Sequence, residues 1–350
     1  MNSKTKGEAI VKRVVENGVA QNDSIQDHAI RDHAIQRKQQ ILTLSAMCLA
    51  LSMAALDDTV VNVALPSLQA QLGMSVAGLQ WMVNAYLLPI ACLVLPAGTL
   101  GDTYGRRRLF LMGLVGFVVA SVLVGLSASG QIAIVGRLLQ GICAAALLPT
   151  SLAILVDAFP NLQQRTKAIG IWSGVSGLAL IVGPALGGLL IDTLGWRSIF
   201  FLNVPLGMMT FGLTCRAVPA GWHGDRYRRR VYLTGRSALQ MDWLGALLSV
   251  TMLAALITLL MGGDGMTLWR GLGLGLLSLG SAIAFVVVER YSARPMLPLT
   301  LFQQPTFTTA IIINILLFFM FGESPCFYLV YFYSRCRAIQ PWLQGCDFFL

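Results

Sequence analysis

The sequence predicts an all-α protein whose chain crosses a lipid bilayer several times. Of its 350 residues, 56% are hydrophobic and 12% are charged, a balance that a soluble domain could not place on its surface. Apolar runs of about 20 residues, long enough to span a bilayer as a helix, recur along the chain. Lys and Arg gather in the polar connections between these runs, as they do in cytoplasmic loops. Together, these three observations predict a polytopic helical bundle.

The first part of the chain divides into a polar tail and a set of apolar runs. Residues 1–38 are charged and weakly patterned, so we expect a cytosolic tail with at most a short amphipathic helix. Within residues 39–215, apolar runs joined by short turns predict an N-terminal bundle of six transmembrane helices. These runs lie at about residues 40–65, 78–100, 109–128, 131–157, 168–191 and 197–215.

A second set of apolar runs follows a polar interruption. Residues 216–241 are rich in Arg and Gly and too polar to span, which predicts a basic cytosolic linker. Two additional transmembrane helices are expected within residues 242–290. Residues 291–350 contain a polar turn and a further apolar run, and we expect them to begin a truncated C-terminal bundle.

The basic residues predict the orientation of the chain. They occupy alternate connections, whereas the turns near residues 66–78 and 127–131 carry no Lys or Arg. The basic connections contain Arg106 to Arg108, Arg165 with Lys167, and the stretch from Arg216 to Arg236. We therefore expect a multi-pass protein of the cell membrane with a cytoplasmic N-terminus. The tryptophans at the edges of apolar runs, Trp196, Trp243 and Trp269, are expected at the lipid interface.

The same pattern argues against several classes of function. The formal net charge is +9, but orientation already accounts for the basic residues, so we expect no nucleic-acid binding. The 3 histidines fall outside the apolar runs, and the 7 cysteines include no Cys-x-x-Cys pair. We therefore expect no metal and no membrane-embedded enzyme.

Two adjacent carboxylates, Asp57 and Asp58, lie within the first apolar run. An ionised side chain at the bilayer centre costs about 2.5–3.5 kcal/mol, so such residues face a cavity or a partner. In a purely structural alternative, Asp57 only hydrogen-bonds a neighbouring helix. Because adjacent helical residues point about 100° apart, we expect one carboxylate to do most of the work. The other acids of the spanning region lie at span ends or in turns, which leaves these two as candidate proton carriers.

One arginine, Arg137, lies inside the fourth apolar run, with Gln140 on the same helical face. Arg137 either finds a counter-charge or polar cavity, or snorkels toward the outer headgroups. The sequence leaves these alternatives open. Gly141 and Ala145 leave room for close packing against a neighbouring helix.

Two glycine-containing strings mark a turn and a helix. The turn from Gly98 to Arg108 is too polar to enter lipid, and its glycines permit a short reversal and close helix approach. Its candidate functional residues are Gly98, Asp102, Gly105, Arg106 and Arg107. In the fifth run, small residues predict tight helix packing and a proline predicts a kink. The residues of that string are Gly177, Gly183, Pro184, Gly187 and Gly188.

These strings, in this order, resemble the drug:proton antiporters of the major facilitator superfamily. They are Leu56 to Pro66, the arginine turn, Arg137 to Gly141, and Gly177 to Gly188. The resemblance associates the last of them with exporters. The strings Gly195 to Gly207, Asp242 to Gly245 and Arg294 to Leu299 are similar to the branch with fourteen spans, in which two extra helices separate two six-helix halves.

The resemblance implies proton-driven export of small amphiphilic or cationic compounds, with a proton gradient rather than a cofactor as the energy source. It implies Asp57 as the proton and cation site, Arg137 as the residue that tunes it, and the Gly98 to Arg108 turn as a latch. It covers about residues 40 to 322, and a truncated or frameshifted gene is expected after that point. The alternative is a non-transporting remnant, or a half-transporter that acts only by association with another chain.

Overall fold

A computed structural model describes residues 3–219, 243–261, 267–292 and 303–321, which form helices and their connections. The helices are α1 (Ser3–Leu72), α2 (Val76–Tyr104), α3 (Arg106–Gly125), α4 (Gly130–Ala158), α5 (Leu162–Leu194), α6 (Arg197–Ala217), α8 (Trp243–Met261), α9 (Leu268–Tyr291) and α10 (Pro305–Phe321). Within the described residues, 8 helices are long and apolar enough to cross a membrane. The predicted all-α polytopic fold class is therefore confirmed.

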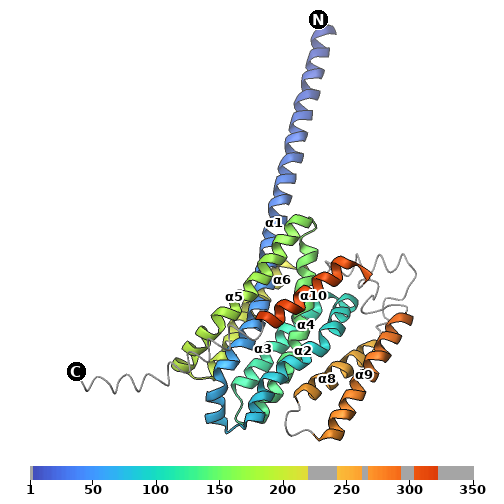
Figure 1. The fold of residues 1–350 in the computed structure, drawn as a ribbon. Helices are drawn as coiled ribbons and strands as arrows, with labels where there is room; N and C mark the ends of the chain where they lie inside the picture. Colours follow the sequence, from blue (N-terminus) through green and yellow to red (C-terminus); the bar gives the residue numbers. More distant parts are fainter. Residues whose placement is uncertain (1–2, 220–242, 262–266, 293–302, 322–350) are drawn as a thin grey trace, which may run out of the picture.

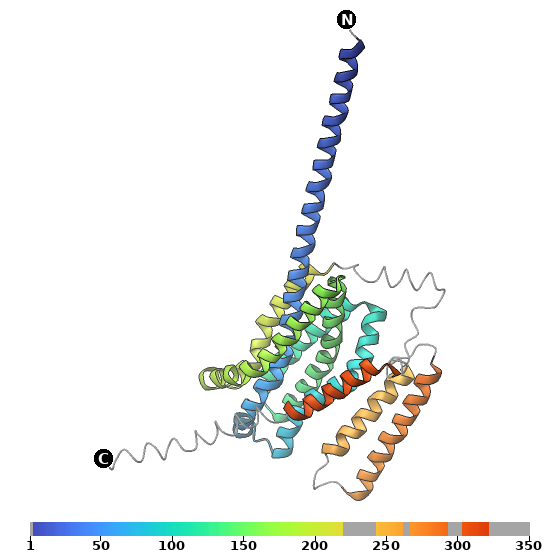
Figure 2. The ribbon, with the colours of Figure 1, turned by 45° about the horizontal axis from the view of Figure 1, so that its top comes forward.

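The first six helices form one bundle (Figure 1). In it, α1 packs against α5 and α6, while α4 packs against α2 and α3. Helices α8 and α9 form a pair beside the bundle, with α8 along α2, as Figure 2 shows. Most of the predicted linker 216–241, and everything after residue 321, lies outside the described residues.

The helix ends follow from local chemistry. Ser75 caps α2 by accepting a hydrogen bond from the backbone N–H of Gly78 at 3.2 Å, and Asn161 caps α5 by accepting one from Gln163 at 2.9 Å. Gly105 alone separates α2 from α3, with φ at 107°, a backbone conformation that side-chain-bearing residues rarely adopt. These short connections hold consecutive helices antiparallel.

Two apolar clusters fill the bundle at different levels. One, nearer the α2–α3 turn, includes Met53, Phe117 and Ala144. The other, nearer the α1–α2 turn, includes Val60 and Ala133. Between these levels, α1 and α4 carry buried polar residues, namely Asp57, Thr59, Arg137 and Gln140, so the interior of the bundle holds charged groups.

The N-terminal segment differs from expectation. We predicted at most a short helix before residue 39, but α1 is continuous from Ser3 to Leu72, and its first part projects away from the bundle (Figure 1). No proline precedes Pro66 in this helix. A helix already nucleated in the first span can therefore extend toward the N-terminus without the cost of a second nucleus.

The expected interfacial position is wrong for Trp196. Its side chain is only 1% exposed, and its indole N–H donates to Gln71 Oε1 at 3.0 Å. The ring also packs edge-to-face on Phe200, with ring centroids 6.1 Å apart. A hydrogen-bond partner inside the protein removes the need for contact with the lipid headgroups.

Candidate functional site

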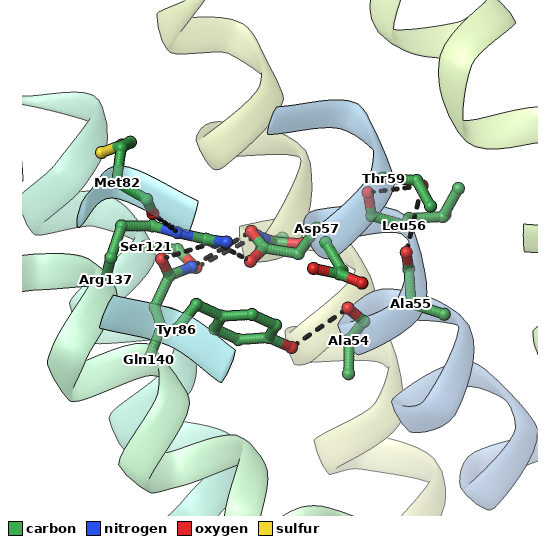
Figure 3. Close-up of polar contacts among 12 residues, drawn as sticks. Ala54, Ala55, Leu56, Asp57, Thr59, Met82, Tyr86, Ser121, Arg137 and Gln140 are labelled. Carbon is green, nitrogen blue, oxygen red and sulfur yellow. Dashed lines mark hydrogen bonds and ion pairs between the residues drawn. The ribbon is translucent and has the colours of Figure 1, made fainter. Parts of the chain in front are cut away.

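The centre of the bundle holds a buried ion pair between Asp57 on α1 and Arg137 on α4 (Figure 3). Both side chains are 0% exposed, and Arg137 Nη1 donates to Asp57 Oδ2. The two alternatives for Arg137 are thus decided in favour of a counter-charge, and snorkelling is wrong. The ion pair satisfies both charges within the protein, which is how charge is tolerated at membrane depth.

Two amide side chains complete the surroundings of the Asp57 carboxylate. Gln140 Nε2 donates to Asp57 Oδ1 at 3.1 Å, and Asn203 Nδ2 on α6 donates to the same oxygen at 2.8 Å. Both amides also donate to Ser121 Oγ on α3, at 2.6 Å from Gln140 and 3.1 Å from Asn203. We call Asp57, Ser121, Arg137, Gln140 and Asn203 the polar cluster.

Helix α2 covers the other side of Arg137. Arg137 Nε donates to the backbone oxygen of Met82 at 3.2 Å, and its guanidinium lies 4.2 Å from the centroid of the Tyr86 ring. The Tyr86 hydroxyl donates to the backbone oxygen of Ala54 at 3.1 Å (Figure 3). A Cβ at Gly141 would lie 2.3 Å from the backbone oxygen of Tyr86, so the glycine allows α2 and α4 to come this close.

The two adjacent carboxylates have different surroundings. Asp57 is buried, whereas Asp58 is partly exposed and, among the described residues, its carboxylate has no hydrogen-bond or ion-pair partner within bonding distance. Asn62, one turn later on the same face of α1, is exposed. The two carboxylates are therefore not equivalent, because Asp57 holds the ion pair with Arg137 and Asp58 does not.

The arginine turn is tied to the end of α4 through Arg106. Its Nε donates to Asp102 Oδ1 at 2.7 Å, and its Nη1 donates to Asp157 Oδ2 and to the backbone oxygen of Ala153, the latter at 3.3 Å. The side chain of Asp102 is 46% exposed, so that contact alone contributes little to stability. Asp157 was assigned to a span end by sequence, but its contact with this turn was missed.

The glycine-containing string of the fifth run splits into two parts. A Cβ at Gly183 would lie 2.0 Å from Thr59 Oγ1, and one at Gly187 would lie 2.7 Å from Val60 Cγ1. These glycines therefore let α5 pack directly against α1, just beyond Asp57. Gly177 and Gly188 have nothing within 4 Å of such a Cβ.

Sequence reasoning missed three residues around Asp57, namely Tyr86, Ser121 and Asn203. Asn203 carried a usable signal, because a fully polar amide in the middle of an apolar run needs partners as Asp57 does. Ser121 and Tyr86 carried a weaker one, since hydroxyls can bond to their own helix. Among the described residues, no group of three or more His, Cys, Asp or Glu side chains could hold a metal ion.

Comparison with known proteins places this arrangement in a family context. The family model described as Major Facilitator Superfamily matches residues 47–338. The Multidrug resistance protein Stp of Mycobacterium tuberculosis is 38% identical over 283 residues, which cover 78% of this chain and 49% of that protein. The Tetracenomycin C resistance and export protein of Streptomyces glaucescens is 33% identical over 309 residues, covering 87% of this chain and 54% of that protein.

Among solved structures, a bacterial homologue of the human lysosomal transporter Spinster, in an inward-facing and unoccupied conformation, aligns with a TM-score of 0.45 and 18% identity. The alignment covers 73% of this chain and 63% of that chain. The chain spans about half the length of the two curated relatives, whose covered shares are 49% and 54%.

Proposed function

The chain belongs to the major facilitator superfamily, and on this premise we propose that it exports small amphiphilic or cationic compounds across the cell membrane in exchange for protons. The names of these relatives, which refer to multidrug resistance and to tetracenomycin C resistance and export, support the direction of transport and the class of substrate. The strings shared with the fourteen-span branch and the α8–α9 pair after the first bundle support that branch.

The buried pair of Asp57 and Arg137 carries the proposal. Apolar side chains at this level would stabilise the bundle at least as well, because the free energy of burying two charges is about as large as the free energy gained from their attraction. A role in stability alone therefore does not account for the pair. The pair also lies between the two apolar clusters, within the parts of α1 and α4 that are apolar enough to span a membrane. Substrate and ion sites of secondary transporters lie near the membrane midplane.

Competition at the carboxylate provides a coupling mechanism. An ionised Asp57 attracts a cation, whether Arg137 or a cationic substrate, and a protonated Asp57 attracts neither. Proton entry from outside therefore weakens the hold on the substrate, and proton loss to the cytoplasm restores it. Proton binding can drive the exchange of substrate only because the ionised and the protonated Asp57 differ in their affinity for the cation. Asp58 is the alternative carrier, because its partly exposed carboxylate is more accessible to water.

The arginine turn is proposed to latch the cytoplasmic face, with the N-terminus on that side. Arg106 joins the α2–α3 turn to α4 through Asp157. A contact of this kind holds the ends of three helices together while other parts of the bundle move. No observation on the described residues favours the alternative of a non-transporting remnant.

The test is proton-gradient-driven uptake of a fluorescent monovalent cation into everted membrane vesicles, whose lumen corresponds to the outside of the cell, so that uptake measures export. Asp57→Asn should abolish uptake driven by a proton gradient while leaving membrane insertion intact, because the amide cannot bind and release the coupling proton. Asp58→Asn should have a milder effect. If Asp57→Asn still exports the cation with normal pH dependence, Asp57 is not the coupling site and the proton must bind elsewhere, with Asp58 the first residue to examine.

A further inference from the structure

We propose that Asn203 on α6 is a positioning residue for Asp57, and that it links proton binding at this carboxylate to the packing of α6 against α1 and α3. The proposal rests on the proposed function, because it concerns how the Asp57 proton site is controlled. It adds to the site a residue of the Gly195 to Gly207 string and the helix α6 that carries it, to which the sequence analysis gave no role.

The geometry that supports this link is a closed ring of hydrogen bonds. Asn203 Nδ2 uses one hydrogen for Asp57 Oδ1 at 2.8 Å and the other for Ser121 Oγ at 3.1 Å. Gln140 Nε2 bonds to the same two oxygens from the opposite side, at 3.1 and 2.6 Å. Four helices, α1, α3, α4 and α6, are thus joined through side chains that are at most 2% exposed.

The ring suits an ionised carboxylate and not a protonated one. Asp57 accepts from two amide groups and from the Arg137 guanidinium, and all three are donors toward it. A protonated carboxyl has an O–H that needs an acceptor. The Gln140 amide presents its nitrogen to Asp57, while its oxygen accepts from Arg137 Nη1 at 3.3 Å, so no acceptor of this amide contacts the carboxyl. Proton binding therefore requires the ring to rearrange.

Asn203 is the member of the ring that involves α6. Gln140 shares its helix with Arg137, so its loss would leave α4 attached to Asp57 through the ion pair. Asn203 is the contact between α6 and the carboxylate. When the ring opens, α6 loses this link to α1 together with its link to Ser121 on α3.

Other charged or titratable groups face Asp57 and must be considered in any pH experiment. They are Asp58 on α1, Tyr86 on α2 and Arg137 on α4. Helices α3 and α6 face it with Ser121 and Asn203, and α5 meets α1 next to it through glycines. The test therefore needs a signal that can be assigned to Asp57 itself.

The experiment is an infrared titration of the purified protein in liposomes. The signal is the protonated-carboxyl band that disappears in Asp57→Asn. Asn203→Leu keeps a similar side-chain volume and removes both donors, so the midpoint of this band should move toward alkaline pH by about one to two units, the size expected for one hydrogen bond to a charged group. Asn203→Ser keeps one donor and should shift the midpoint less. This second variant is used if Asn203→Leu does not fold.

Thr210→Val is the matched control. Thr210 is also buried on α6, but its hydroxyl donates to the backbone oxygen of Leu206 in its own helix at 2.8 Å. It should leave the midpoint unchanged. If Asn203→Leu and Asn203→Ser also leave it unchanged while Asp57→Asn removes the band, the role of Asn203 is overturned and the proposed function stands. If no band depends on Asp57 at any pH, both are overturned.

Hydrogen–deuterium exchange tests the link to α6 separately. In the unmodified protein, exchange of peptides from Arg197–Ala217, corrected at each pH for the intrinsic rate of amide exchange, should rise once the pH falls below the midpoint of the Asp57 band. In Asn203→Leu it should be equally fast on both sides of the midpoint. Exchange in α6 that is independent of pH in the unmodified protein would overturn the link, since Asp57 would then titrate without loosening the helix.

Discussion

Replacing Arg137 by methionine should be one of the most destabilising single changes in the bundle. Methionine matches much of the length of the arginine stem but leaves the buried Asp57 carboxylate without its counter-charge. Both side chains of the pair are 0% exposed, so water cannot replace the lost partner. Removing one member of a buried ion pair costs about 3–5 kcal/mol of unfolding free energy. The lost contact with the Tyr86 ring at 4.2 Å adds to this cost.

The reverse change and the double change separate the ion pair from simple packing. Asp57→Asn leaves Arg137 buried without a counter-charge, so it should cost a similar amount. Asp57→Asn combined with Arg137→Met removes both charges together. The double variant should therefore lose less stability than the sum of the two single variants, by on the order of 2–3 kcal/mol. The coupling arises because the second substitution removes the charge that the first left unpaired.

The assay is reversible unfolding in mixed micelles with increasing denaturing detergent, followed by tryptophan fluorescence. Leu138→Met, at a 40% exposed position next to Arg137, is the matched control and should change stability by no more than about 0.5 kcal/mol. If the two single losses add within about 0.5 kcal/mol in the double variant, Asp57 and Arg137 do not interact as a buried pair and the account of the site is wrong.

Two further predictions concern packing and orientation. Gly183→Ala should destabilise the bundle by about 1–3 kcal/mol in the same unfolding assay, because its Cβ would lie 2.0 Å from Thr59 Oγ1. Gly174→Ala, with nothing within 4 Å, should cause no loss, and equal losses at both positions would refute direct α1–α5 contact at Gly183. In a cysteine-free background, Gln164→Cys should react with an impermeant thiol reagent only from the cytoplasm and Val76→Cys only from outside. The opposite labelling pattern would overturn the orientation.

Much of the fold was predictable because membrane insertion depends on local properties of the chain. The length of an apolar run decides whether it can span the bilayer. The helix ends are also local, because Ser75 caps α2 with its own side chain and Gly105 adopts a backbone conformation that favours glycine. The depth of Asp57 and Arg137 within their runs also marked them as residues that need partners. The same reasoning failed for the N-terminal segment. Its polarity predicted little helix, but a helix that has formed in the first span can extend into this segment without a new nucleation step.

The sequence by itself determined which residues must avoid lipid, and the tertiary structure decided which partners they found. Asp57 is separated from Arg137 by 80 residues and from Asn203 by 146, and their contact depends on how α1, α4 and α6 rotate and slide against one another. That arrangement is fixed by close packing at positions such as Gly141 and Gly183, where a single added carbon would collide with the neighbouring helix. A helical pattern gives the face on which a residue lies. The identity of the side chain opposite depends on the packing of the whole bundle.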